Sequence, residues 1–186
     1  MIGYAFCGSF CTLSASLVEL RKLIRAGEDV QPIVSDNVFS IDTRFYLAAD
    51  FIREVEEICG RTVIHSIVDA EPLGPKTPLD LLIIAPCTGN TLAKMAHGIT
   101  DTPVTMAAKA HLRTERPLLL ALATNDALSA NLSNLAILSM RKGVYFVPMH
   151  QDDPEKKPSS LVADFSLLGK ALAAARQGKQ LRPIFL

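Results

Sequence analysis

Four short segments rich in Ser, Thr, Asn and Gly follow apolar runs of this chain, at residues 8–12, 35–37, 86–91 and 124–126. These residue types expose hydroxyl and backbone N–H groups. Where such a segment opens a helix, its free N–H groups bind anions, and phosphate in particular. A single Gly-Ser turn is a weak signal because a plain helix cap explains most of them. Four such segments at one edge of a sheet favour a ligand that carries phosphate.

Known sequence fingerprints narrow the class of ligand. From Gly3 to Ser9 the chain reads G-Y-A-F-C-G-S, so the dinucleotide fingerprint G-x-G-x-x-G is absent and a mononucleotide such as FMN fits better than NAD. H-E-x-x-H, G-x-S-x-G and G-x-x-x-x-G-K-[ST] are also absent, which disfavours a zinc protease, a serine hydrolase and an NTPase. Cys7 and Cys11 form a close pair without the second half of a zinc site, so we predict no bound metal.

The polar segments need a scaffold that brings them together, and the chain alternates strand-like and helix-like stretches throughout. This alternation predicts an α/β protein with a three-layer, doubly wound parallel sheet of flavodoxin-like Rossmann topology, in which ligands bind at the carboxyl ends of the strands. We expect one domain over residues 1–186, in which 151–186 forms a substrate loop and a C-terminal helix. The expected strands are 2–7, 30–34, 64–68, 79–85, 118–123 and 144–147, and the expected helices are 13–26, 43–59, one from 91, 104–112, 132–141 and 161–176.

Composition excludes two classes of partner. Lys plus Arg and Asp plus Glu number 19 each, so the formal net charge is zero, which argues against nucleic acid. The longest apolar runs are far shorter than the roughly 20 residues of a membrane span, and the N-terminus lacks the basic region of a signal peptide, so we expect a cytoplasmic protein. An apolar content of 49% with little net charge also favours self-association.

The third polar segment carries a resemblance to a known family. The run A-P-C-T-G-N-T-L-A-K from Ala85 to Lys94, followed by Gly98 and Asp101, resembles the signature of FMN-dependent cysteine decarboxylases and flavin prenyltransferases. Within this flavoprotein family, the chain is most similar to the B subunits of dipicolinate synthases. That similarity covers about residues 2–183 and is carried by the stretches 37–45, 67–76, 123–128 and 151–158.

The resemblance implies an FMN site. Its phosphate would be held at the first two polar segments, and its ring would lie between the third and the fourth. The implied cofactor-binding residues are Gly8, Ser9 and Ser35 for the phosphate, Pro86, Thr88 and Asn90 beside the ring, and Thr124 and Asn125 on the opposite wall.

Two departures from the family pattern disfavour cysteine decarboxylation. The decarboxylases carry a catalytic His about fourteen positions before the Pro of the flavin loop, and Pro72 stands there in this chain. Their relatives in pantothenate metabolism carry a Met-Asn-x-x-Met clamp, which is replaced here by Thr124, Asn125 and Asp126.

Dipicolinate synthases, as the resemblance implies, oxidise a cyclic dihydrodipicolinate-type product of the lysine pathway to pyridine-2,6-dicarboxylate in the mother cell of spore-forming bacteria. Their A subunit resembles a nicotinamide-dependent dehydrogenase, which would hold NAD(P). A planar dicarboxylate substrate needs cations, and Arg offers a bidentate clamp that Lys does not. The candidate substrate-binding residues are Arg44, Lys109, Lys156 and Lys157, and the candidate catalytic residues are Asn90 and His150; for each cation the alternative is a solvated surface charge.

Three functions stay open at this point. The chain is a flavin-binding subunit of a two-subunit oxidoreductase, a stand-alone FMN-dependent decarboxylase or flavin prenyltransferase, or a non-catalytic subunit that stabilises the dehydrogenase. The relatives also imply a homo-oligomer, either a trimer or a dodecamer, with the flavin at a subunit boundary.

Overall fold

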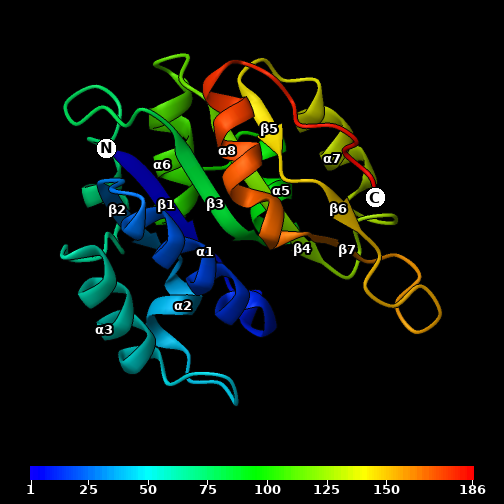
Figure 1. Ribbon diagram of the computed structural model, residues 1–186, viewed down its shortest axis with the longest axis horizontal. Helices are drawn as coiled ribbons and strands as arrows, with labels where there is room; N and C mark the ends of the chain where they lie inside the picture. The colour runs from blue at the N-terminus through cyan, green and yellow to red at the C-terminus, as the bar shows by residue number, and fades with distance from the viewer.

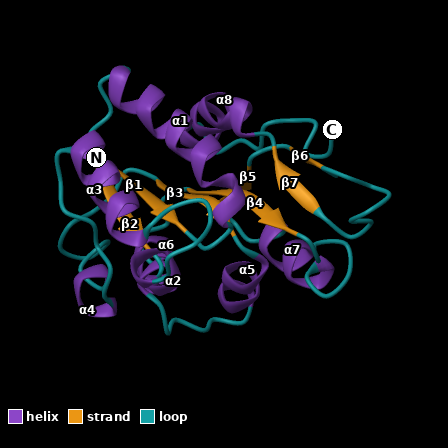
Figure 2. Ribbon diagram, turned by 90° about the horizontal axis from the view of Figure 1, so that it is seen from below, coloured by secondary structure: helices purple, strands orange, loops and turns teal.

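The computed structural model describes all 186 residues and shows a seven-stranded sheet between two layers of helices (Figures 1 and 2). The strands are β1 (Ile2–Phe6), β2 (Val30–Val34), β3 (Leu82–Cys87), β4 (Leu118–Thr124), β5 (Val144–Phe146), β6 (Met149–His150) and β7 (Leu161–Ala163). The helices are α1 (Leu13–Arg25), α2 (Asp36–Ser40), α3 (Ala48–Cys59), α4 (Ile67–Ala70), α5 (Gly89–Ala96), α6 (Pro103–Leu112), α7 (Leu132–Ser139) and α8 (Leu168–Arg176), with 3₁₀ turns at Phe10–Thr12 and Phe165–Leu167.

The central strands are parallel and run in the order β2-β1-β3-β4, with β5 parallel to the first half of β4. This order confirms the α/β fold with flavodoxin-like topology that the alternating pattern predicts. The carboxyl ends of these strands lie at one edge, so the segments that follow them meet there.

Each face of the sheet has its own apolar core. Strand residues alternate between the faces, so Tyr4 and Phe6 pack under α1, α3 and α8, whereas Ala5 packs with α5, α6 and α7. Figure 2 shows α1, α3 and α8 on one side of the sheet and α5, α6 and α7 on the other. None of the helices combines the length and the apolar composition that crossing a membrane would require.

The expected helix 161–176 is wrong in its first part. Leu161–Ala163 forms β7, which pairs antiparallel with the last residues of β4 and with β6, so the sheet is mixed rather than fully parallel. Burial alternates along this segment, as it does in a strand with one covered face: Leu161 and Ala163 are buried, and Val162 between them is half-buried. The helix itself begins only at Leu168, after the Asp164 carboxylate has capped a 3₁₀ turn.

Other boundaries also differ from the prediction. The expected strand 64–68 is a single bridge between Ile64 and Ile33, after which the Ser66 hydroxyl caps α4. The expected helix 43–59 begins at Ala48. Strand β3 continues through Pro86 to Cys87 with an irregular register, instead of ending at residue 85, and α5 begins two residues earlier than expected.

Candidate functional site

Two adjoining cavities lie where the polar segments meet at the carboxyl edge of the sheet. The inner cavity, of about 380 Å³, lies between Gly8, Ser35, Thr88 and Lys94 and has an almost entirely polar lining. The outer cavity, of about 760 Å³, shares Gly8, Thr88 and Asn90 with the inner one. It extends past Ser9, Phe10, Arg44, Phe45, Thr124, Asn125, Asp152 and Lys157. All four polar segments of the sequence therefore contribute to one continuous site.

A buried hydrogen-bond network fixes the strand that leads into this site. The Ser16 hydroxyl of α1 donates to the carbonyl oxygen of Ala85 at 2.6 Å, and the Tyr4 hydroxyl pairs with the Ser16 hydroxyl at 2.9 Å. Pro86 follows directly, is buried in β3 and lines neither cavity. Pro86, which the resemblance places beside the flavin ring, therefore lies outside both cavities. It belongs to the strand that positions Thr88.

The hydroxyls at the strand ends serve mainly as helix caps. The Ser35 hydroxyl accepts the Val38 N–H at 3.5 Å, and the Thr88 hydroxyl accepts the Thr91 N–H at 3.2 Å. The Thr91 hydroxyl in turn donates to the Cys7 sulfur at 3.3 Å. The donors left free are the N–H groups of Gly89 and Asn90, the first two residues of α5.

Gly89 allows α5 to begin against the wall formed by the β4–α7 loop. A Cβ on Gly89 would lie 2.6 Å from both the Asn131 Nδ2 and the Thr124 Oγ1 atoms, and 2.7 Å from the Asp126 Oδ1 atom. Any side chain at Gly89 would push the two walls of the site apart. The sequence alone does not identify Gly89 or Asn131 as site residues. The one indication for Gly89 is its position between Thr88 and Asn90, two residues that the resemblance places beside the flavin.

The donor set fits FMN. The polar inner cavity offers hydroxyls and free N–H groups of the kind that hold a phosphate. The outer cavity adds aromatic and aliphatic walls from Phe10, Phe45 and Val162, which suit a ring system. Lys94 lines the inner cavity but is ion-paired to Asp101 at 2.8 Å, so a phosphate there would be held chiefly by dipoles.

Two cations reach the outer cavity from opposite parts of the chain. Arg44 lies in the segment before α3, is exposed, and has its guanidinium 4.8 Å from the centre of the Phe45 ring with no carboxylate partner. Lys157 lies in the segment between β6 and β7 and pairs with Asp152 at 2.7 Å. A ligand with two carboxylates would therefore meet one free cation, Arg44, and one cation that is already paired with Asp152.

Three other predicted residues, Lys109, Lys156 and His150, lie outside the two cavities. The Lys156 ammonium lies 3.7 Å from Asp153 and is exposed. Lys109 lies on α6 beside a separate small hollow, and His150 is exposed on β6. Of the two catalytic candidates, only Asn90 lines the cavities, and its exposed side chain has no partner within the protein.

Two buried cysteines, Cys7 in the lining of the inner cavity and Cys87 at the end of β3, are poor nucleophiles at neutral pH. Burial raises the pKa of the Cys7 thiol to about 11, against a smaller lowering by the Thr91 hydroxyl. Burial also raises the pKa of Cys87, with Cys7 adding to the effect. Both thiols are therefore protonated, which favours a structural role.

Asp152 holds together the loop that carries Lys157, and this loop should loosen in acid. The Lys157 ammonium and the Ser160 hydroxyl lower the pKa of Asp152 to about 2. Because this pKa is below the ordinary value of about 3.9, the stabilisation is complete above about pH 4 and is lost as the pH falls toward 2. We expect hydrogen exchange of residues 153–160, corrected for the intrinsic rate, to accelerate over this range.

The variant Asp152→Asn should show the fast exchange already at neutral pH. Glu155→Gln in the same loop is the matched control, because Glu155 is exposed and its carboxylate has no partner. Exchange in Asp152→Asn that equals that of the unaltered chain at pH 7 would contradict a role for Asp152 in this loop.

The fold and the paired cavities define the class of protein. The sequence matches the Flavoprotein family over residues 2–170, and the chain therefore belongs to that family.

Within the family, the chain groups with the B subunits of dipicolinate synthases. It is 46% identical over 185 residues to the dipicolinate synthase B subunit of Bacillus subtilis, covering 100% of this chain and 92% of that protein. The crystal structure of the dipicolinate synthase B subunit from Bacillus halodurans superposes with a TM-score of 0.91 at 40% identity, covering 100% of this chain and 95% of the other. The FMN-dependent cysteine decarboxylase SpaF shares the fold, with a TM-score of 0.69 at 24% identity over 94% of this chain and 95% of the other.

Proposed function

We propose that this chain is the flavin-binding subunit of a two-subunit dipicolinate synthase. Together with a dehydrogenase-like A subunit that binds NAD(P), it would oxidise a dihydrodipicolinate-type intermediate to pyridine-2,6-dicarboxylate. The full-length similarity to dipicolinate synthase B subunits supports this proposal. The observation that carries it is that Arg44 and Lys157 line the same cavity as Thr88 and Asn90 of the flavin loop.

The residues of the two cavities have separable roles in this proposal. Gly8, Ser35 and the start of α5 would hold the FMN phosphate. Ser9, which the resemblance assigns to the phosphate, lines the outer cavity and would border the ring with Thr124 and Asn125. Arg44 would bind one substrate carboxylate in a bidentate pair, and Lys157 would bind the other. Asn90 would orient the substrate ring from the flavin side. Aromatising a dihydropyridine ring removes a hydride and a proton; FMN, when bound, would supply a hydride acceptor that oxidised NAD(P) of the A subunit restores, and the proton would leave to water.

A stand-alone decarboxylase is disfavoured by the place of Pro72. Pro72 occupies the position where the decarboxylases carry their catalytic His, and it lies in the turn after α4 rather than in either cavity. The next residues of that turn pack on α6, because a Cβ on Gly74 would collide with the Ala110 carbonyl oxygen. His65 is no substitute, since its ring stacks on Phe39 at 3.9 Å and lines neither cavity.

The visible spectrum of the purified chain, recorded before and after addition of FMN, tests the flavin part of the proposal. We expect a bound-flavin spectrum after addition. A chain that takes up no FMN would favour the non-catalytic, stabilising subunit instead.

The reaction is tested by assaying pyridine-2,6-dicarboxylate formation with the A subunit and NAD(P), with and without this chain. We expect both subunits to be required. Product formation at the same rate by the A subunit alone would contradict a catalytic role, and decarboxylation of a peptidyl-cysteine by this chain alone would favour the decarboxylase alternative.

A further inference from the structure

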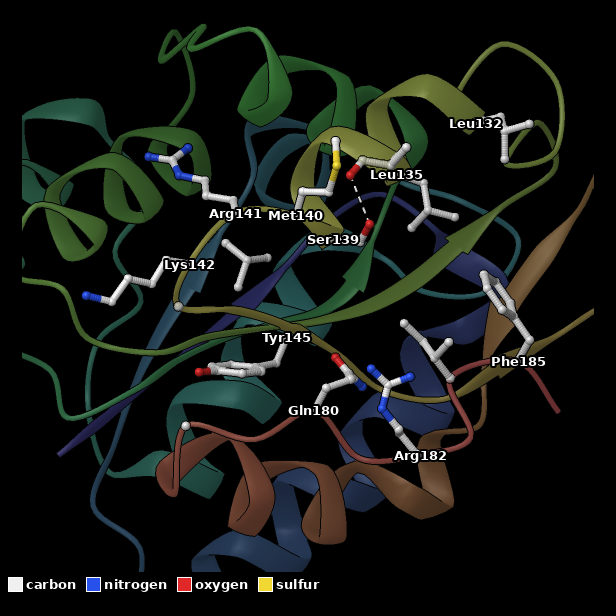
Figure 3. A pocket seen from close by; sticks show the side chains of 15 residues that line it. Leu132, Leu135, Ser139, Met140, Arg141, Lys142, Tyr145, Gln180, Arg182 and Phe185 are labelled. Atoms are coloured by element: carbon white, nitrogen blue, oxygen red, sulfur yellow. Dashed lines mark hydrogen bonds between the residues drawn. The ribbon is translucent and has the colours of Figure 1, made fainter.

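A second large groove lies at the opposite flank of the sheet, between α7, the edge strand β5 and the C-terminal tail (Figure 3). We call it the C-terminal groove. It has a volume of about 730 Å³, and it shares no lining residue with the two cavities of the cofactor site. Its characteristic residues are Leu132, Met140, Arg141, Tyr145, Arg182 and Phe185.

Hydrogen bonds hold the walls of the C-terminal groove in place. The Gln180 side chain accepts the Phe146 N–H at 2.8 Å and donates to the Phe146 carbonyl oxygen at 2.7 Å. Further along, the Met149 N–H donates to Ile184 and the Leu186 N–H donates to Met149, both at 2.9 Å. The tail thus closes the open edge of the sheet. An occupant would contact side chains of the groove and would not add a strand.

Large apolar side chains stand exposed along the C-terminal groove. Met140 is 79% exposed, Phe185 54% and Leu132 49%. Clustered apolar side chains that remain open to water are typical of a protein–protein contact. A small-molecule site instead buries most of its ligand among enclosed apolar walls.

The C-terminal groove is also strongly cationic although the chain has no net charge. Arg141, Lys142 and Arg182 line it, and no carboxylate does. Arg141 and Arg182 have no ion pair, and the nearest carboxylate to Lys142 is that of Glu115 at 3.8 Å. Figure 3 shows Arg141 and Lys142 toward one end of the groove, with Met140 beside Arg141, and Arg182 on the side of Phe185. Cations therefore lie beside apolar side chains along the groove, and the matching occupant carries both carboxylates and large apolar side chains.

From this pattern we infer that the C-terminal groove docks an acidic, apolar segment of the A subunit; the inference rests on the proposed function for the existence of that partner. A groove-to-groove contact between two copies of this chain is a poor match, because both grooves are equally cationic. Docking at this flank leaves the cofactor site open to substrate.

The inference is tested by measuring the affinity of the purified A subunit for the full-length chain and its variants by isothermal titration. Arg182→Glu reverses a free cation, and Met140→Asp places a charge on the exposed apolar wall. We expect each to weaken binding at least tenfold. Both side chains are exposed, and a thermal unfolding curve verifies that each variant is folded. Arg25→Glu on α1 is the matched control, because Arg25 is also an exposed arginine without an ion pair, and it should bind within twofold of the unaltered chain.

The outcomes separate the two proposals. If the unaltered chain does not bind the A subunit at all, the two-subunit function is overturned. If it binds, but the folded groove variants bind equally well, only the docking inference is overturned. A change in the sedimentation of the chain alone on Arg182→Glu would assign the C-terminal groove to a second copy. Binding of free pyridine-2,6-dicarboxylate to the unaltered chain that is lost in Arg182→Glu, while the affinity for the A subunit stays unchanged, would assign the groove to a small ligand. Both results would overturn docking.

Discussion

Replacing Gly89 with alanine is expected to weaken FMN binding at least about tenfold and to lower the thermal stability of the chain. The added Cβ would lie 2.6–2.7 Å from side-chain atoms of Thr124, Asp126 and Asn131. These short side chains have little room to move, because the Thr124 hydroxyl donates to Asp126 and the Asn131 amide oxygen accepts from Asn134. The start of α5 must then shift away from the β4–α7 loop, at the overpacking cost of about 1–3 kcal/mol. A shift there separates two walls of the outer cavity.

The measurement is a titration of the apo-protein with FMN followed by flavin fluorescence, together with a thermal unfolding curve. Gly169→Ala is the control, since a Cβ on Gly169 in α8 meets no atom within 4 Å. Because Gly169 is the second residue of α8, alanine there should change the stability by less than the helix-interior difference of about 0.5–1 kcal/mol and leave the FMN affinity unchanged. FMN affinity in Gly89→Ala equal to that of the unaltered chain would contradict a flavin site at the start of α5.

The convergence of the polar segments could be predicted because the carboxyl ends of parallel strands share an edge whatever the details of packing. Gly8, Ser35 and Thr88 each follow such a strand and Thr124 ends one, and each lies where that rule places it. The residue types likewise predict hydroxyl and N–H donors for an anion at this edge. What could not be read was which hydroxyls are already engaged, because the Ser35 and Thr88 caps depend on where the helices begin.

The C-terminal part of the chain was harder to predict because its structure depends on distant partners. Strand β7 exists because Leu161 and Ala163 pair with β4 and β6, and three residues are too few to show the period-2 pattern. The tail is held through Gln180, whose contact with Phe146 leaves no pattern in the sequence. The sequence alone also predicts substrate binding by both Lys156 and Lys157, because it does not show which of two neighbouring side chains faces the site. Only Lys157 lines the outer cavity.

Removing the charge of Arg44 is expected to weaken the binding of pyridine-2,6-dicarboxylate about 10- to 100-fold while FMN affinity changes less than twofold. A charge-assisted hydrogen bond contributes about 1.5–3 kcal/mol, and each 1.4 kcal/mol corresponds to tenfold in affinity. Arg44 is the cation to test because no carboxylate of the chain neutralises it, whereas Lys157 is already paired with Asp152. The measurement is a calorimetric titration of the dicarboxylate into the FMN-loaded variant Arg44→Gln.

Two further variants show whether geometry or charge alone is responsible for this effect. Arg44→Lys keeps the charge but loses the planar fork, so we expect it to recover only part of the affinity. Arg53→Gln removes an arginine that pairs with Asp50 on α3 outside both cavities, and it should bind the dicarboxylate as the unaltered chain does. Equal losses of FMN and dicarboxylate affinity in Arg44→Gln would show that Arg44 supports the whole site rather than the substrate. Because Arg44 stacks on Phe45 at the mouth of the outer cavity, a selective loss is the result that this geometry predicts.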